Sequence, residues 1–202
     1  MPPDPDVSSP DYWSDLYRRG EDGWEKGLPS PPVVSLARTL APGRVAVLGC
    51  GRGHEASALA ALGWEAVGFD FAPEAVAAAR RRTKGKRGLR FEEADLFDLP
   101  ARHAGTFDAV CEHTCFCAID PKRRPAYVRA AAALLRPGGV LFGVFYAHGN
   151  PGGPPFTTDV AEVRRRFGRA FRIDRLEVAP DSFPNRQGKE LAAVFRRRAQ
   201  RR

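Results

Sequence analysis

The sequence lacks the features that would place the protein in a membrane or a disulfide-bonded class. It has no apolar run of about 18 residues, the length that spans a bilayer. Its first residues, Met-Pro-Pro-Asp-Pro-Asp, have neither the basic start nor the apolar stretch of a secretory signal. Cysteine is scarce, with four residues in a chain of 202. We therefore expect a reduced, cytoplasmic protein with no membrane partner.

The cysteines also lack the spacing of a metal site. Cys111, Cys115 and Cys117 crowd into seven positions around His113, and Cys50 is the only other cysteine. Structural zinc sites usually combine paired Cys-x2–4-Cys units from two segments, and this chain has no second unit. The sequence predicts no bound metal and no evident disulfide framework.

The positive charge lacks the aromatic side chains that nucleic-acid surfaces use for base stacking. The formal net charge is +8, and arginines cluster at 80–82, 164–166 and 196–202 without interleaved aromatics. We interpret these clusters as solvated helix faces and a basic tail, so no nucleic-acid partner is expected. An RNA-associated basic protein is kept as an alternative. A mild positive field can also attract small anions.

Length and composition indicate one soluble domain. Hydrophobic residues make up 43% of the chain and charged residues 28%, which is ordinary for a globular protein. Residues 1–10 are rich in Pro, Asp and Ser, so we expect a disordered tail followed by a single domain over 11–202. No internal repeat is visible. We expect a monomer, because no large exposed apolar patch can be inferred.

Apolar segments alternate with helical segments through most of the chain. This order predicts a doubly wound α/β fold with a mostly parallel, seven-stranded, Rossmann-like sheet and helices on both faces. The last two strands, 171–178 and 191–195, have a Pro-containing loop between them, which predicts an antiparallel hairpin at one edge. The other predicted strands are Val45–Leu48, Trp64–Phe69, Leu89–Glu92, Phe107–Cys111 and Val140–Tyr146.

A glycine turn and a following acid form the most informative motif. The strand Val45–Leu48 ends in Gly49-Cys-Gly51-Arg-Gly53, where glycines let the backbone approach a ligand closely. The next predicted strand is followed by Asp70, 21 positions after Gly49. That spacing places a carboxylate at a ribose diol. Together the strand, the glycines and the acid predict a nucleoside-binding site.

The details of this motif distinguish between nucleosides. The NAD fingerprint has its third glycine after two spacers, whereas these glycines alternate and Glu55 would face a diphosphate. No Gly-Lys-Ser/Thr follows, so a P-loop is excluded. S-adenosylmethionine (SAM) carries no phosphate and tolerates this loop. Asp95 follows the third strand, where it either accepts from the adenine amino group or caps a turn.

Several motifs together resemble a known family. The sequence resembles the thiopurine S-methyltransferase family of class I SAM-dependent methyltransferases, and within it the halide/thiol methyltransferases. The resemblance runs from about Trp13 to the C-terminus. It rests on Trp13-x3-Tyr17-x2-Gly20-x3-Trp24-x2-Gly27, Leu48-Gly-Cys-Gly-Arg-Gly-His54, Val67-Gly-Phe-Asp70, Phe107-Asp-Ala-Val-Cys-Glu-His-Thr-Cys-Phe-Cys-Ala-Ile119, Arg124-Pro-Ala, Leu134-Leu-Arg-Pro-Gly-Gly139, Gly152-Gly-Pro-Pro155 and Phe183-Pro-Asn-Arg186-Gln-Gly188-Lys-Glu190.

The resemblance implies SAM as cofactor, S-adenosylhomocysteine (SAH) as product, and a helical lid over residues 11–43. It implies that the lid aromatics cover the cofactor and that the glycine turn holds its methionine part. The implied cofactor-binding residues are Trp13, Tyr17, Trp24, Gly49, Gly51, Gly53, Asp70, Phe71, Asp95, Leu96, Glu112 and His113. Three positions depart from the usual family residues, namely Tyr17 (commonly Trp), His113 (often Tyr or Arg) and Cys115 (often Phe).

The resemblance further implies methyl transfer to a small sulfur or halide nucleophile, such as a thiol, bisulfide, thiocyanate or iodide, by direct in-line displacement. Trp24, Phe116 and Tyr146 are the candidate walls of the substrate site. No side chain is assigned as catalytic, and His113 and Tyr146 are the candidates to assist a neutral thiol. Arg186 and Lys189 either attract an anionic substrate or are solvated. Alternatives are an aromatic, thiopurine-like or natural-product substrate, and SAM binding without turnover.

Overall fold

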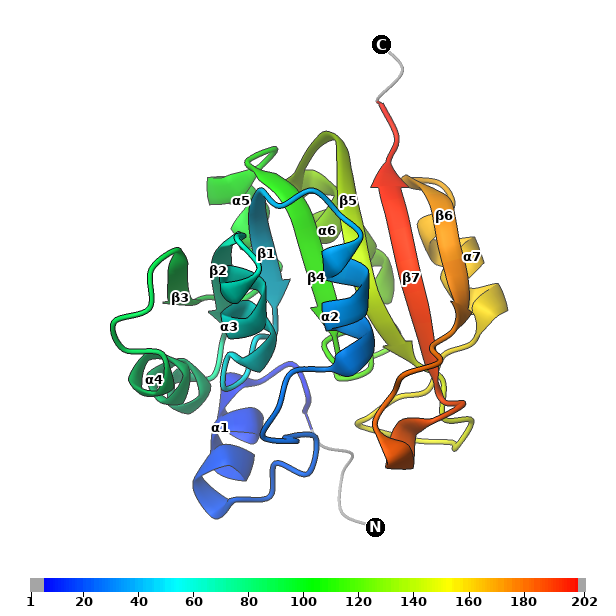
Figure 1. The fold of residues 1–202 in the computed structure, drawn as a ribbon. Coiled ribbons are helices and arrows are strands. Elements are labelled where there is room, and N and C mark those ends of the chain that lie inside the picture. Colours follow the sequence, from blue (N-terminus) through cyan, green and yellow to red (C-terminus); the bar gives the residue numbers. More distant parts are fainter. Residues whose placement is uncertain (1–5, 200–202) are drawn as a thin grey trace.

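The computed structural model of the protein describes residues 6–199. Its centre is a seven-stranded sheet in the order β3-β2-β1-β4-β5-β7-β6 (Figure 1). The strands are β1 (Arg44–Leu48), β2 (Glu65–Asp70), β3 (Leu89–Glu93), β4 (Phe107–His113), β5 (Leu135–Tyr146), β6 (Phe171–Val178) and β7 (Glu190–Arg197).

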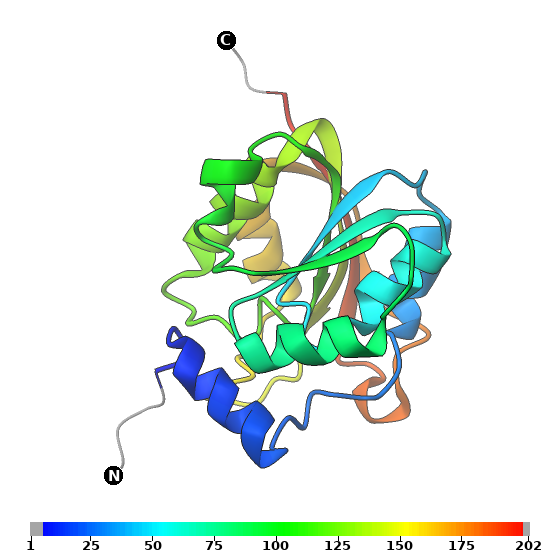
Figure 2. The same cartoon turned by 90° about the vertical axis from the view of Figure 1, so that its left-hand side faces the viewer.

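Helices cover both faces of this sheet. The elements are α1 (Pro10–Arg19), α2 (Pro31–Arg38), α3 (His54–Ala61), α4 (Pro73–Arg82), α5 (Leu99–His103), α6 (Arg124–Leu134), α7 (Val160–Phe167) and the 3-10 turn η1 (Pro184–Arg186). Helices α2, α3 and α4 lie on one face and α5, α6 and α7 on the other (Figure 2). Helix α1 lies beyond the carboxyl ends of the parallel strands, where it forms a layer of its own.

The pairing of the strands confirms the predicted fold. Strands β3, β2, β1, β4 and β5 pair in parallel, and β7 pairs antiparallel to both β5 and β6. The order reverses at β1, so the crevice beside β1 and β4 is where a doubly wound sheet binds its ligand. The antiparallel hairpin β6–β7 closes one edge, as the Pro-containing loop predicts.

The largest differences from the sequence-based expectation are the start of β5 and the helix α5. Strand β5 begins at Leu135 and includes the Arg136-Pro-Gly-Gly139 segment, whereas the predicted strand begins only at Val140. The reason is that Leu135 is already extended and pairs with Phe107 across a register shift in β4. The short helix α5 follows Asp98 and was not expected, because five residues carry too little periodicity to reveal a helix.

The two faces of the sheet are packed differently. The face under α6 and α7 is rich in phenylalanine, and the ring centroids of neighbouring pairs among Phe116, Phe145, Phe167 and Phe195 lie 5.1–5.8 Å apart. The face under α2, α3 and α4 uses small alanines and valines around Trp64. Aromatic pairs at these distances add specific edge contacts to the burial of apolar surface.

Part of the segment predicted to be disordered has a defined structure. Ser9 caps α1, whose first turn begins at Pro10. Val7 is buried, and its carbonyl accepts a hydrogen bond of 2.9 Å from the indole nitrogen of Trp13. Residues 1–5 of the predicted tail lie outside the described residues.

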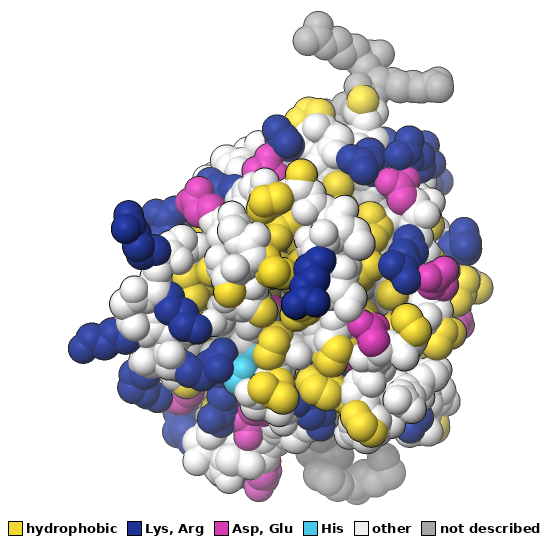
Figure 3. Space-filling model, in the orientation of Figure 1, with side chains coloured by type: hydrophobic (Ala, Val, Ile, Leu, Met, Phe, Trp, Pro, Cys, Tyr) yellow, Lys and Arg dark blue, Asp and Glu magenta, His cyan; other side chains and the backbone are white. Residues whose placement is uncertain are grey.

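The described residues include no helix that could span a membrane, and one face of the molecule carries dispersed positive charge. Within residues 6–199 no helix is both long and apolar enough to cross a bilayer. On the face drawn in Figure 3, lysine and arginine side chains are dispersed over most of the surface.

Gly143 tests the packing of the central strands. It pairs with Glu112, its φ is +147°, and a Cβ there would lie 1.9 Å from the Glu112 carbonyl oxygen. Gly143→Ala should lower the free energy of unfolding by about 2–3 kcal/mol, measured by urea titration. Gly23→Ala, with open space around its Cβ, is the matched control. Equal effects of the two variants would show that this close approach does not limit stability.

Candidate functional site

A pocket lies at the carboxyl ends of the parallel strands, beneath the N-terminal segment. We call residues 10–30, which comprise α1 and the loop that follows it, the cap. The pocket is lined by the cap, the glycine turn after β1 and the ends of β2, β3 and β4. From the predicted site it includes Trp13, Tyr17, Trp24, Gly49, Gly51, Asp70, Phe71, Asp95, Leu96 and His113.

Asp70 joins β2 to the glycine turn. Its Oδ2 accepts from the Gly51 N–H at 2.9 Å, and its Oδ1 accepts from the Ala72 N–H at 3.0 Å. The carboxylate is buried but still lines the pocket. Burial raises the pKa of Asp70, because desolvation outweighs the backbone N–H groups that favour its charge.

Asp95 performs the turn-capping function that the sequence left open. Its Oδ1 accepts from the Phe97 N–H at 2.9 Å. The residue also lines the pocket together with Leu96 and Phe97, so capping does not remove it from the ligand surface. The guanidinium of Arg123 lies 3.9 Å from the centroid of the Phe97 ring and borders the same region.

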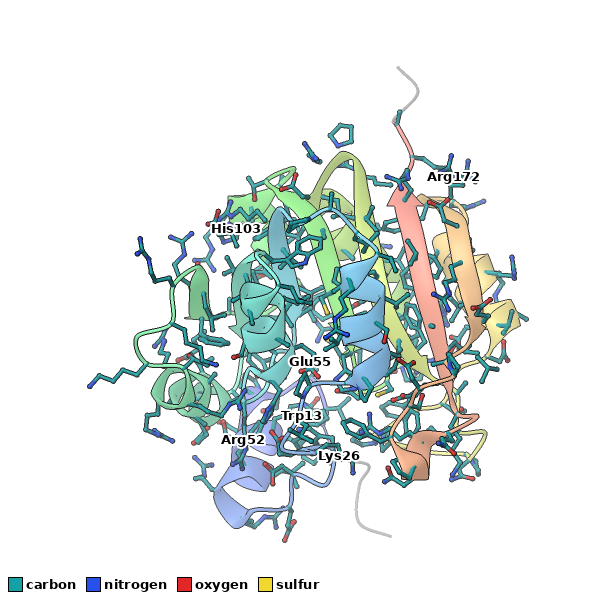
Figure 4. The ribbon with its side chains drawn as sticks, viewed as in Figure 1. Trp13, Lys26, Arg52, Glu55, His103 and Arg172 are labelled. Carbon is teal, nitrogen blue, oxygen red and sulfur yellow. The ribbon has the colours of Figure 1, made fainter. Side chains whose placement is uncertain are left out.

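The cap presents a cluster of aromatic rings to the pocket. Trp24 packs edge-on against Trp13 and Tyr17, with ring centroids 5.4 and 5.5 Å apart. Burial raises the pKa of Tyr17, so its hydroxyl stays protonated. Figure 4 shows Trp13, Lys26, Arg52 and Glu55 gathered at the cap end of the sheet, while His103 and Arg172 lie at the opposite end.

Polar side chains that sequence reasoning missed connect the cap to the glycine turn. Arg52 pairs with Asp22 at 2.5 Å and with Glu25 at 3.8 Å. His54 Nε2 lies 2.8 Å from Glu25 Oε1. Burial lowers the pKa of His54, which makes it a neutral donor to this carboxylate. The polar residues of the Arg52-Gly-His54 sequence were the available signal for these contacts. Their partners lie about 30 residues earlier, so the pairing itself could not be inferred from local sequence.

A second polar chain begins at Glu55, which also lines the pocket. Its Oε1 accepts from the Ser30 N–H at 3.0 Å and lies 2.9 Å from Nδ1 of His113. Nε2 of His113 lies 3.2 Å from a guanidinium nitrogen of Arg186. Both ring nitrogens of His113 therefore have protein partners. From the sequence, Glu55 was considered only as a negative charge that disfavours a bound diphosphate.

The electrostatic interaction between Glu55 and His113 favours the charged form of both side chains. Burial disfavours the Glu55 carboxylate, but attraction to His113 and the Ser30 N–H lower its pKa to about 2. Burial likewise disfavours a charged His113, but the neighbouring Glu55 outweighs it and raises the pKa of that imidazole. A buried ion pair of this kind persists only because each member is hydrogen-bonded.

The structure places four predicted site residues away from the pocket. Gly53 packs against β3, since a Cβ there would lie 2.5 Å from the Phe91 ring. Phe116 is 1% exposed within the phenylalanine core, and the Tyr146 ring packs at a tilt against His148, with ring centroids 4.7 Å apart. Of the three predicted substrate walls, only Trp24 lines the pocket.

Glu112 is the fourth of these residues, and it faces the core. It is 1% exposed and accepts from the N–H groups of Cys115 and Phe116 at 3.0 and 2.8 Å. Its other oxygen accepts from the Tyr127 hydroxyl. Glu112 therefore shapes the turn after β4, and the assignment of its side chain to the cofactor is corrected.

The cysteines are buried thiols. All four are free, and burial raises the pKa of Cys50, Cys111, Cys115 and Cys117, so they stay protonated. Within the described part of the chain no group of three or more His, Cys, Asp or Glu residues is arranged to hold a metal ion.

Comparison with known proteins agrees with this geometry. Residues 8–201 match the family described as thiopurine S-methyltransferase. The chain belongs to this family. Thiocyanate methyltransferase 1 of Arabidopsis thaliana is 34% identical over 88% of this chain and 81% of its own length. Thiopurine S-methyltransferase of Legionella pneumophila is 25% identical over 82% and 84% of the two chains.

Solved structures of similar fold include the 1,6-didemethyltoxoflavin-N1-methyltransferase of Burkholderia thailandensis with bound SAH. Its TM-score is 0.74 at 21% identity, over 94% of this chain and 87% of that one. This thiopurine S-methyltransferase family member is a SAM-dependent methyltransferase, and SAM is its cofactor. The pocket fits SAM chemically, because Asp70 and Asp95 accept from hydroxyl and amino groups and repel phosphate.

Asp70 should be required for cofactor affinity. Asp70→Asn replaces a carboxylate, which can accept from both hydroxyls of a ribose diol, with an amide that has one acceptor oxygen, so the Kd for SAM should rise about tenfold or more by isothermal titration. Asp174→Asn, which loses an exposed pairing to Arg172 on β6, is the control and should leave the Kd unchanged. An unchanged Kd for SAM in the Asp70 variant would show that the ribose does not bind at Asp70.

Glu112 should make stability depend on pH. Burial raises its pKa from 4.5 to about 7. As the pH rises through this window the unfolded chain loses the proton while the folded chain keeps it, so the free energy of unfolding falls. The total fall is about 3 kcal/mol at most. Glu112→Gln should abolish this part of the pH dependence in urea titrations, and an unchanged slope would mean that Glu112 is ionised when folded.

Proposed function

We propose that this protein transfers the methyl group of SAM to a small sulfur anion, such as a thiolate, bisulfide or thiocyanate, or to iodide, by direct displacement. The observation that carries the proposal concerns His113, the last residue of β4, which lines the pocket. Both nitrogens of its imidazole have protein partners, namely Glu55 and Arg186. The relatives named for thiocyanate and thiol methylation support the same class.

The proposed placement of the cofactor follows the pocket from one end to the other. Asp70 would bind the ribose, and Asp95 and Leu96 would border the adenine. The turn Gly49–Gly51 would lie along the methionine part. This arrangement directs the methyl group toward the remaining part of the pocket, which Trp24 and His113 line. We call this part the methyl-acceptor site.

No strong base is free at the methyl-acceptor site in this arrangement, because the lowered pKa of the neighbouring Glu55 makes its carboxylate a weak base. A neutral His113 donates from Nδ1 to Glu55 and accepts at Nε2 from Arg186, whereas the charged imidazolium has no lone pair at all. The Cys115 thiol is protonated, because burial raises its pKa. An anionic nucleophile needs no proton removed, so the absence of a strong free base favours one.

Catalysis would then come from positioning. SAM supplies an electrophilic methyl group and leaves as the neutral thioether SAH. The chain's residues hold the nucleophile about 3–3.5 Å from that methyl group, in the geometry of attack. Trp24, braced by Trp13 and Tyr17, forms an apolar wall that excludes water from the anion.

The test is SAH formation by the purified protein with SAM and thiocyanate, bisulfide, iodide or an aromatic thiol. Turnover is expected with the small anions. Between about pH 6 and 9, kcat/KM for thiocyanate should stay flat, whereas that for sulfide should follow the fraction present as bisulfide. Turnover with the aromatic thiol alone would overturn the proposal in favour of a thiopurine-like substrate. No turnover with any of them would overturn the substrate class.

A further inference from the structure

Two separate sets of polar contacts hold the cap loop at and next to Trp24. We propose that the cap loop, residues 20–30, is a clamp with two separable ties, in which Asp22 positions Trp24 for the cofactor and Arg186 positions it for the methyl acceptor. The part that concerns the methyl acceptor rests on the proposed function. Neither Asp22 nor Arg186 lines the pocket, so both would act as positioning residues.

The cofactor-side tie joins the cap loop to the glycine turn. Asp22 is 11% exposed at its side chain and pairs with Arg52 at 2.5 Å. The Glu25 N–H donates to the Asp22 carbonyl at 2.8 Å, so one turn carries both carboxylates and has Trp24 within it. Glu25 then contacts His54 at 2.8 Å. This tie therefore fixes Trp24 relative to the turn that would hold the methionine part of SAM.

The acceptor-side tie joins the same loop to the C-terminal hairpin. One guanidinium nitrogen of Arg186 donates to the Trp24 carbonyl at 3.4 Å, across 162 positions of sequence. The other contacts Nε2 of His113 at 3.2 Å and donates to Glu190 at 3.2 Å. The guanidinium also lies 5.1 Å from the Tyr146 ring centroid. Arg186 thus touches the cap, β4, β5 and β7 at once.

The charged side chains of the acceptor-side tie are buried, so their positions are fixed by their protein partners. The side chain of Arg186 is 6% exposed and that of Glu190 is 1% exposed. A buried arginine holds its charge only where fixed partners replace water. The sequence offered two roles for Arg186, attraction of an anion or a solvated side chain, and its burial behind His113 fits neither. It reaches the methyl-acceptor site only through Trp24 and His113.

Loss of each tie should change a different kinetic parameter, because the two ties join the cap loop to different parts of the site. The cofactor-side tie contacts the glycine turn and leaves His113 untouched. The acceptor-side tie contacts His113 and leaves the glycine turn untouched. Loss of one tie should therefore weaken one ligand, whereas a general loosening of the cap would weaken both.

The experiment measures KM and kcat for SAM and for thiocyanate, and the Kd for SAM by titration, in three main variants and in Arg186→Lys. Asp22→Ala removes the cofactor-side tie. The double variant Arg186→Gln with Glu190→Gln removes the acceptor-side tie without leaving a buried charge unpaired. Arg136→Gln, which loses the exposed ion pair of Arg136 with Asp108, is the control and should match the wild type.

For Asp22→Ala we expect the KM and Kd for SAM to rise about tenfold, with the KM for thiocyanate changed less than about twofold. The double variant should show the reverse. A lesser Arg186→Lys variant keeps the charge and should recover part of the affinity for thiocyanate. A role in stability alone would lower Tm in both variants without splitting the two KM values.

Two results would overturn the clamp: equal effects of both variants on SAM and thiocyanate, or no effect of either. If the wild type methylates no small anion, the proposed function fails, and the Kd values for SAM still decide the clamp. In that case Asp22→Ala must weaken SAM about tenfold while the double variant leaves it unchanged. Any other pair of Kd values contradicts the inference.

Discussion

The hydrogen bonds between the Asp70 carboxylate and the N–H groups of Gly51 and Ala72 are the constraint on which the site depends. They connect the end of β2 to the turn after β1 and to the start of α4. Since β1 and β2 pair in register along their length, the two strands deliver these groups to the same edge of the sheet. The acid, the turn and the helix are therefore one rigid unit beside the pocket.

The cap completes the pocket and is held by a side chain from near the other end of the chain, which lies outside the pocket lining. The cap comes from residues 10–30, and Arg186 comes from the β6–β7 hairpin. The cap and this hairpin come together at Trp24 and His113. Four buried ionisable side chains contact one another there in the order Glu55, His113, Arg186 and Glu190. Each of these groups has a fixed partner, which the low dielectric of the interior requires. A site built this way suits a substrate that arrives with its own charge and gives up no proton.

The sequence predicts the sheet, its antiparallel hairpin and the place of the glycine turn beside Asp70 because these depend on local patterns. Alternating apolar and helical segments give the layers, and the strand ends bring the glycines and Asp70 to one edge of the sheet. The polar ties could not be predicted, because Arg52, Glu55 and Arg186 find partners far away in sequence. Phe116 was assigned to the pocket because it follows β4 at the ligand edge. The turn that Glu112 holds directs it into the phenylalanine core instead.

The most direct test of the central claim is a crystal structure of the protein with SAH and thiocyanate. The account predicts thiocyanate against Trp24 beside the sulfur of SAH, with His113 still bridging Glu55 and Arg186. If His113 instead turned from Arg186 to bind the anion, or if thiocyanate bound only outside the pocket, the assignment of a methyl-acceptor site without a strong free base would be contradicted.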